Sequence, residues 1–235
     1  MLAGLVKGIV GFAMPMVMVS LLSGVTTPEL ALAGLILPTL ITNCAQAMRQ
    51  GAHAAVASIY RFRVYLLVGG FMLLLSAQLV LVLPIAVLLG LIGVPVVGFA
   101  VLQLFGVQFR LSGQSVRTEA SVGAFAGFLG GMSGIWGPPT VMYLTALGTE
   151  KSEQMRAQGV IYGLGAVGLL GAHISSGVLH TQAALFSAAL VVPALFGQWL
   201  GGRFLDRVDQ VFFRRATLVV LLVAGLNLIR RAVFG

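Results

Sequence analysis

Glycine and proline interrupt a long apolar segment near the middle of the sequence. From Gly127 to Pro139 it reads GFLGGMSGIWGPP, with five glycines and two adjacent prolines. Proline has no backbone N–H and its ring clashes with the preceding turn, so this stretch predicts a broken helix. Inside a membrane, freed backbone groups are tolerated only where protein or a water-filled cavity receives them. A break of this kind therefore indicates a functional site.

Anion binding is the chemistry expected at this break. A helix that begins inside the membrane presents unpaired N–H groups and the positive end of its dipole to a ligand. Pro138 and Pro139 suit the first helical turn, and Thr140 can add a hydroxyl group at the same end. A second interruption, Gly11-Phe12-Ala13-Met14-Pro15, predicts a matching half-helix. We expect the two breaks to meet near the middle of the bilayer and to hold a small anion.

Polar residues of the flanking segments complete the predicted site, and each has an alternative role. Asn43 and Gln46 lie one helical turn apart and can face the ligand or hydrogen-bond to another helix. The same alternatives apply to Gln158 and Tyr162, which have i, i+4 spacing. Lys7 can bind the anion or extend to the membrane surface. The predicted substrate-binding residues are Gly11, Phe12, Met14, Pro15, Asn43, Gln46, Ser133, Gly134, Trp136, Gly137, Pro138, Pro139, Thr140, Gln158 and Tyr162.

The composition places the chain among integral membrane proteins. Of its 235 residues, 59% are hydrophobic and only 9% are charged, which is too little charge for a soluble domain of this size. The net charge of +8 is assigned to cytoplasmic loops, where basic residues collect, and nucleic-acid binding is not expected. The single cysteine, Cys44, excludes an intrachain disulfide and is expected to be a buried packing residue. The histidines have no metal-ligand spacing and the sequence has no P-loop, so we expect no metal, no cofactor and no ATP hydrolysis.

Eight apolar segments are long enough to cross about 30 Å of hydrocarbon. The first has neither a basic leader nor a small-residue cleavage site, so we interpret it as mature protein and not as a signal peptide. A hydrophilic linker, 110–119, separates a first transmembrane repeat, 1–109, from a second, 120–235, within one structural domain. The segments are Leu2–Ser23, Pro28–Ala47, Val64–Leu83, Ile85–Val107, Ser121–Leu147, Ala157–Val178, Ala183–Phe204 and Val211–Ile229.

The two halves resemble each other. In each, a segment interrupted by glycine and proline precedes a short turn, an acidic helix start and further helices. Paired interruptions at matching positions are typical of transporters built from repeats, whereas chance similarity in a glycine-rich sequence is the alternative. The aligned positions are Gly8 with Gly131, Gly11 with Gly134, Pro15 with Pro139, Gly24 with Gly148 and Glu29 with Glu153.

The positions of arginine and lysine favour an inverted repeat. If all eight segments cross, the basic residues divide almost equally between the two sides, which hardly satisfies the positive-inside rule. If the first and fifth segments are re-entrant hairpins, only Arg230 and Arg231 lie outside. The residues inside are then Arg49, Arg61, Arg63, Arg110, Arg117, Lys151, Arg156, Arg203, Arg207, Arg214 and Arg215. We therefore expect an all-α polytopic protein of two inverted repeats, with both termini outside a bacterial inner membrane.

At these residues the sequence resembles the sulfite exporter TauE/SafE family, the 4-toluene sulfonate uptake permease group of membrane transporters. Gly127 to Pro139, followed by Leu147-Gly148-Thr149 and the helix start at Glu153, matches the second-half pattern of this family. The first half lacks the usual run of glycines. The resemblance implies transport of small sulfur-containing or organic anions, such as sulfite, sulfoacetate and other sulfonates. It is also compatible with a homodimer.

Two other functions are alternatives to transport. Gly131-Met132-Ser133-Gly134 has the form of a rhomboid nucleophile motif, and an intramembrane serine protease would need His173 within hydrogen-bond reach of Ser133. A passive anion channel would use the same helix N-termini as a transporter. For a transporter, an ion or proton gradient is the expected energy source. Glu29 and Glu153 are candidate proton carriers, although a carboxylate at a helix start also stabilises the helix dipole.

Overall fold

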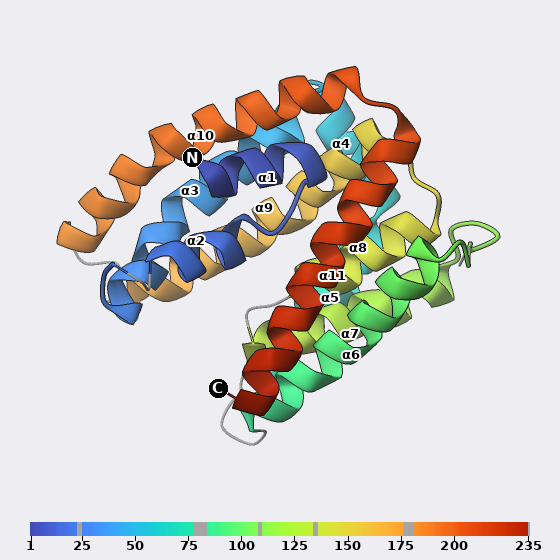
Figure 1. The fold of residues 1–235 in the computed structure, drawn as a ribbon, viewed down its shortest axis with the longest axis horizontal. Coiled ribbons are helices and arrows are strands. Elements are labelled where there is room, and N and C mark those ends of the chain that lie inside the picture. The colour runs from blue at the N-terminus through green and yellow to red at the C-terminus, as the bar shows by residue number, and fades with distance from the viewer. Residues whose placement is uncertain (23–24, 78–83, 108–109, 134–135, 176–180, 235) are drawn as a thin grey trace. The chain divides into compact units, whose positions relative to one another are not determined.

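A computed structural model describes residues 1–22, 25–77, 84–107, 110–133, 136–175 and 181–234. Within these residues all regular structure is helical, which confirms the predicted all-α class (Figure 1). Two described helices, α10 (Thr181–Arg207) and α11 (Gln210–Phe234), are long and apolar enough to cross a membrane. The bent pair α4 (Ala52–Arg61) and α5 (Arg63–Ala77) adds a third span if it is counted as one. Ala33–Met48 and Leu89–Leu104 are shorter apolar stretches of helix.

Helix contacts divide the described chain into two compact units, and each unit takes segments from both halves of the sequence. Unit 1 comprises Met1–Ser58 and Met155–Phe213, and unit 2 comprises Ile59–Gln154 and Arg214–Gly235. Unit 1 holds α1 (Leu2–Val10), α2 (Met14–Leu22), α3 (Pro28–Met48), α10 and most of α4 and α9 (Lys151–Ser175). Unit 2 holds α5, α6 (Ile85–Leu104), α7 (Val116–Ser133), α8 (Gly137–Ala146) and most of α11.

Local hydrogen bonds explain where several helices begin. Pro28 occupies the first turn of α3, as expected, and the Leu30 N–H donates to the Thr27 hydroxyl at 3.3 Å. The Glu119 N–H donates to the Ser115 carbonyl at 2.8 Å, so α7 already begins at Val116. The end of the predicted 110–119 linker is therefore helical. The sequence did not predict α4, whose residues lie between the second and third expected segments.

In unit 1, α1 packs against α10 through glycines on both helices. A Cβ atom added at Gly4 or Gly8 would overlap a backbone carbonyl oxygen of α10. The converse holds at Gly197 and Gly201, where an added Cβ would overlap carbonyl oxygens near the start of α1. Small residues of this kind let helix backbones approach closely in the absence of a hydrophobic driving force.

In unit 2, α7 packs against α5 in the same manner. A Cβ atom at Gly123 would lie 2.8 Å from the Tyr65 carbonyl oxygen, and one at Gly127 would overlap the Gly69 carbonyl. The Ser76 hydroxyl also donates to the Gly127 carbonyl at 3.5 Å. Gly127, the first residue of the interrupted stretch, therefore serves helix packing.

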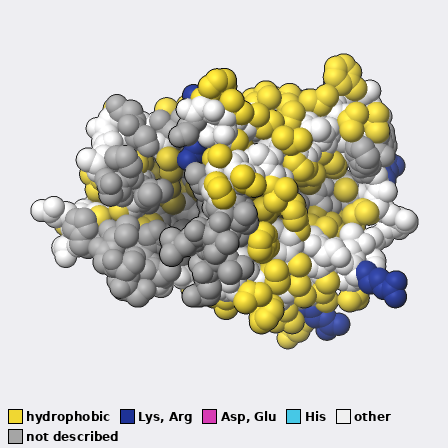
Figure 2. All heavy atoms as spheres, turned by 90° about the horizontal axis from the view of Figure 1, so that it is seen from below, with side chains coloured by type: hydrophobic (Ala, Val, Ile, Leu, Met, Phe, Trp, Pro, Cys, Tyr) yellow, Lys and Arg dark blue, Asp and Glu magenta, His cyan; other side chains and the backbone are white. Residues whose placement is uncertain are grey.

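Large apolar side chains are exposed on the described helices, as lipid contact requires. Leu67 on α5, Val192 on α10 and Val223 on α11 are each more than half exposed. Figure 2 shows hydrophobic side chains spread over one face, with a few Lys and Arg side chains among them. Cys44 is exposed on α3, so the expectation that it is a buried packing residue is wrong. The buried polar side chains Asn43 and Gln46 on either side of it occupy the inward face of that helix.

Candidate functional site

The first predicted interruption lies between α1 and α2, where the chain turns back and α2 runs alongside α1 (Figure 1). Gly11 ends α1 in the left-handed conformation, with φ of +85°, and its N–H donates to the Lys7 carbonyl at 2.7 Å. Ala13 has φ of +70°, a conformation that is strained for any residue except glycine. Gly11 adopts its conformation without strain, whereas the surrounding structure must hold Ala13 in place.

Two glutamine side chains satisfy the carbonyl groups that the break leaves free. Gln46 Nε2 on α3 donates to the Gly11 carbonyl at 3.2 Å and to the Met155 carbonyl at 2.7 Å. With its amide oriented to satisfy both of its polar atoms, Gln158 Nε2 on α9 donates to the Val10 carbonyl at 3.1 Å and to Gly11 at 3.2 Å. Both side chains are fully buried. They supply the internal partners that a helix break requires inside a membrane protein.

Replacing Gln158 with Leu should destabilise the folded protein, because the buried Val10 carbonyl loses its side-chain donor and the Gly11 carbonyl keeps only Gln46. The expected loss is about 1–3 kcal/mol, seen as a lower melting temperature in detergent. Gln154→Leu is the matched control on the same helix. The Gln154 side chain is equally buried, but its amide nitrogen has no hydrogen-bond partner among the described residues, so its removal should cost little. Equal losses for the two variants would contradict the role given to Gln158.

Lys7 lies in the last turn of α1, one turn before the break, and its side chain is only 2% exposed. It does not extend to the surface. Its ammonium group donates to the Asn43 side-chain carbonyl of α3. The ion pairs found among the described residues are Arg49–Asp206 and Arg61–Glu153, so the described partner of Lys7 is neutral. An ammonium group buried against a neutral amide is costly unless an anion completes its surroundings.

The remaining predicted residues of unit 1 form no described hydrogen bond to the carbonyl groups of this break. Phe12 and Met14 are buried, and the Thr42 hydroxyl lies 3.6 Å from the Met14 sulfur. Pro15 is partly buried in the first turn of α2. Tyr162 is buried on α9, one turn beyond Gln158. Phe12 and Met14 are therefore apolar side chains packed beside the break, and their predicted contact with a ligand stays a prediction.

The residues that contact the break come from the ends of their helices. Gln46 belongs to the last turn of α3, whereas Met155 and Gln158 belong to the first two turns of α9. In unit 1 the break therefore contacts the helix ends that carry Arg49 and Arg156. The predicted depth of the break, near the middle of the bilayer, stays a prediction.

The second interruption lies between α7 and α8 in unit 2. Pro138, Pro139 and Thr140 are buried in the first turn of α8, with the prolines at its first positions, as predicted. The Thr140 hydroxyl donates to the Trp136 carbonyl at 2.8 Å and lies 2.6 Å from the Tyr65 hydroxyl. Because its one hydrogen is used, Thr140 accepts from Tyr65. Its hydroxyl thus fastens α8 to α5.

The start of α8 offers few backbone donors. Pro138 and Pro139 have no N–H, and the Thr140 N–H is 3.4 Å from the Trp136 carbonyl. Gly137 is already engaged in an interaction. The buried Tyr143 ring stacks on Tyr65 with centroids 6.1 Å apart, and its hydroxyl has no described partner. Among the described residues, this break provides a helix dipole but no cation.

Sequence reasoning missed the polar network at the base of unit 2. Glu119, only 3% exposed, accepts from the Tyr65 N–H at 3.0 Å and from Gln114 Nε2 at 2.8 Å. Gln114 also bonds to Arg61, which pairs with Glu153. An acidic residue at the edge of an apolar segment was the only available signal, and it was assigned to the linker. Glu153 therefore does more than stabilise a helix dipole.

Several predicted residues lie outside the described part of the chain. Gly134 is among them, and the side chains of Ser133 and His173 are not described either. The side chain of Glu29 is likewise outside the description. The proposed Ser133–His173 pair therefore stays a prediction from sequence. Among the described residues there is no group of three or more His, Cys, Asp and Glu side chains that could hold a metal ion.

Together these features define a polytopic helical membrane protein whose first and seventh helices end at breaks, an organisation found in many transporters. The family model for the sulfite exporter TauE/SafE matches residues 1–228, and the chain belongs to this family of membrane transporters. Comparisons with curated proteins and with solved structures found no match. Membership of a transporter family also argues against the protease alternative.

Proposed function

We propose that this protein is a secondary transporter of small sulfur-containing anions, such as sulfite, sulfoacetate or other sulfonates. The anion binds at the α1–α2 break of unit 1. The observation that carries the proposal is Lys7, which is buried beside the break against a neutral amide. Family membership supports the anionic substrate class, and the lack of a P-loop in the sequence supports coupling to an ion gradient.

The binding step follows from the chemistry of the break. An entering anion takes the ammonium group of Lys7 as its counter-charge, and Asn43 holds the amine toward the break in its absence. The α2 helix starts at Met14 and turns the positive end of its dipole to the same place. Phe12 and Met14 form the apolar side of the site. The site thus replaces part of the hydration of the anion with a charge, a dipole and an apolar wall.

The pairing of helices supports the proposed inverted repeat. The helix before the first break, α1, packs on α10, which is the third segment of the second half. The helix before the second break, α7, packs on α5, which belongs to the third segment of the first half. Glycines make both contacts, including Gly4 and Gly127, which the alignment of the halves relates. In this proposal Arg49 and Arg203 face the cytoplasm.

A thermal-shift screen of purified protein tests the proposed substrate class. Sulfite, sulfoacetate and thiosulfate should raise the melting temperature in a concentration-dependent manner, because a ligand that binds only the folded state stabilises it. At a concentration 100 times Kd the stabilisation is about 2.7 kcal/mol. Sulfate and short carboxylates measure selectivity, and chloride at equal ionic strength is the control. Identical melting temperatures with all of these anions would refute binding of this class.

A further inference from the structure

A groove of about 510 Å³ lies in unit 1, between α3 and α10, with α1 at its floor. Its outer part carries Arg49, Arg203 and Asp206, and its inner part carries Gly8, Gln46 and Gln198. The volume is in the range of small-molecule sites. All of these residues belong to one unit, so the groove is formed within a single packed body.

The charges of the groove favour a negatively charged occupant. Arg49 pairs with Asp206 at 2.6 Å and donates to the Gly202 carbonyl at 3.2 Å. Arg203 contacts the Trp199 ring, 4.3 Å from its centroid, and belongs to neither of the ion pairs found among the described residues. Two guanidinium groups against one carboxylate leave one net positive charge. Arginine is also the side chain best suited to phosphate.

The inner wall of the groove has acceptors without donors. Gln46 and Gln198 use their amide nitrogens on backbone carbonyls, and the Gln198 bond to Thr42 measures 2.8 Å. The side-chain oxygens of both residues are buried, and neither has a hydrogen-bond partner among the described residues. A buried acceptor without a donor is destabilising, so the site is incomplete as it stands. These oxygens have almost no accessible surface, so a hydroxyl or ammonium donor in the groove reaches them once the amide groups turn toward it.

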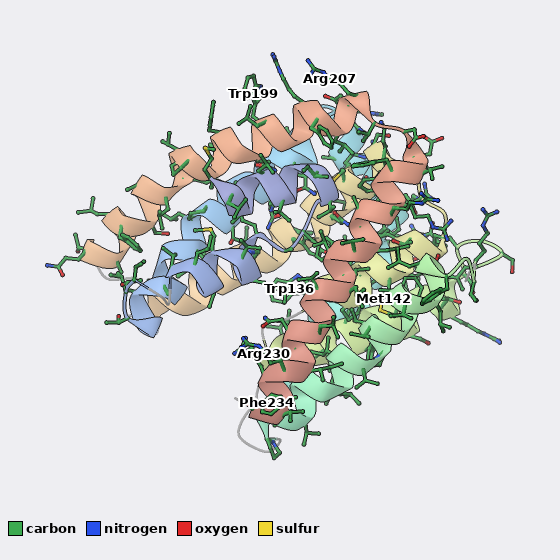
Figure 3. All side chains as sticks on the ribbon, in the orientation of Figure 1. Trp136, Met142, Trp199, Arg207, Arg230 and Phe234 are labelled. Carbon is green, nitrogen blue, oxygen red and sulfur yellow. The ribbon has the colours of Figure 1, made fainter. Side chains whose placement is uncertain are left out.

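The exposed surface of α10 indicates what kind of molecule would bring a negative charge and a hydrogen-bond donor to the groove. A stripe of exposed apolar side chains, Leu185, Val192, Phe196 and Trp199, runs along one face of the helix and ends at Arg203. Their helical spacing keeps them on that face. Trp199 projects from α10 on the side away from α1 (Figure 3). Tryptophan and arginine at the end of an apolar helix are typical of the membrane–water interface.

We propose that this groove binds the headgroup of a phospholipid, with an acyl chain along the α10 stripe. The phosphate lies against Arg203 and Arg49, and a headgroup hydroxyl or ammonium group faces Gln46 and Gln198. An anionic glycerol headgroup fits both requirements, since it combines net negative charge with hydroxyl donors. A choline headgroup supplies the phosphate but neither a net charge nor a donor. The bound lipid would brace α3 and α10 beside the α1–α2 break.

Lipid titration of the delipidated, detergent-purified protein tests this proposal. Short-chain phosphatidylglycerol should raise the melting temperature and should be retained in native mass spectra, whereas the matching phosphatidylcholine should do neither. Arg203→Gln should weaken phosphatidylglycerol binding roughly fivefold, the effect of about one interfacial charge. Arg207→Gln, on the same helix but outside the groove, is the matched control. Lys7→Met should leave lipid binding unchanged, which separates this proposal from the transport site.

The possible outcomes decide between a lipid and another occupant. Preference for phosphatidylglycerol that is lost in Arg203→Gln and kept in Arg207→Gln supports the proposal. The proposal is overturned if both lipids raise the melting temperature equally, or if the two variants lose phosphatidylglycerol binding equally. Either result would indicate unspecific attraction between the basic residues and the lipid. The proposal is also overturned if inorganic phosphate or sulfite raises the melting temperature, the lipid does not, and the effect is lost in Arg203→Gln. The groove would then bind a soluble anion. If Arg203→Gln fails to fold, Arg203→Lys takes its place and should retain a weakened preference.

Discussion

Replacing Gly127 with Ala should prevent stable folding, because the added methyl group has no room between α7 and α5. The new Cβ would overlap the Gly69 carbonyl oxygen, which belongs to the backbone of α5 and cannot rotate away. Relief requires α7 and α5 to separate along their contact. The expected loss is about 3 kcal/mol or more, at the upper end for overpacked sites. Melting temperature and yield of monodisperse protein in detergent measure it.

Gly70→Ala is the control for this prediction. Gly70 follows Gly69 on α5, has no positive φ, and would place its new Cβ in open space. Because alanine is the better helix former by about 1 kcal/mol, this variant should be neutral or more stable. A Gly127→Ala protein as stable as wild type would show that α7 and α5 do not pack as described.

Replacing Lys7 with Met should abolish anion transport while the protein still folds. The methionine keeps the length and apolar stem of the lysine and removes the cost of burying a charge. That gain offsets the loss of the donor to the Asn43 side chain, so the protein should still fold. The anion loses its counter-charge, so initial uptake should fall at least about tenfold, the cost of one charge-assisted contact in a buried site. Uptake of labelled sulfite or sulfoacetate into proteoliposomes measures this loss.

The chain contains one other lysine, and it provides the control. Lys151→Met removes the same charge at the start of α9, away from the α1–α2 break. It should transport at close to the wild-type rate. A purely structural role for Lys7 would lower the melting temperature without changing the affinity for anions. Normal uptake by a folded Lys7→Met protein would contradict the proposed site but not the proposed transport.

The helix breaks could be predicted from sequence because proline and glycine act locally. Pro15 and the pair Pro138–Pro139 restrict the backbone, and Gly11 permits the left-handed conformation, regardless of what surrounds them. The structure accordingly places a break at both predicted stretches. The all-helical class followed from hydrophobic content alone. The family assignment followed from the same stretches, and the family model confirms it over residues 1–228.

Side-chain partners could not be predicted, because they depend on which helices meet. Asn43, Gln46 and Gln158 were chosen as polar residues within apolar segments. The structure shows that the two glutamines hold the break itself and that Asn43 holds Lys7. Glu119 accepts a hydrogen bond from α5, and no local sequence pattern predicts that α5 and α7 meet at this residue.

Uptake of labelled sulfite by proteoliposomes that contain the wild-type protein tests the central proposal most directly. A proton or sodium gradient is imposed across vesicles that differ in nothing else, and the internal concentration is followed to a steady state. A gradient-coupled transporter accumulates the anion above the external concentration, and collapse of the gradient releases it. If sulfite only reaches the external concentration, the protein is a channel. Transport of this class would be contradicted if the vesicles were no more permeable to sulfite, sulfoacetate and other sulfonates than protein-free controls.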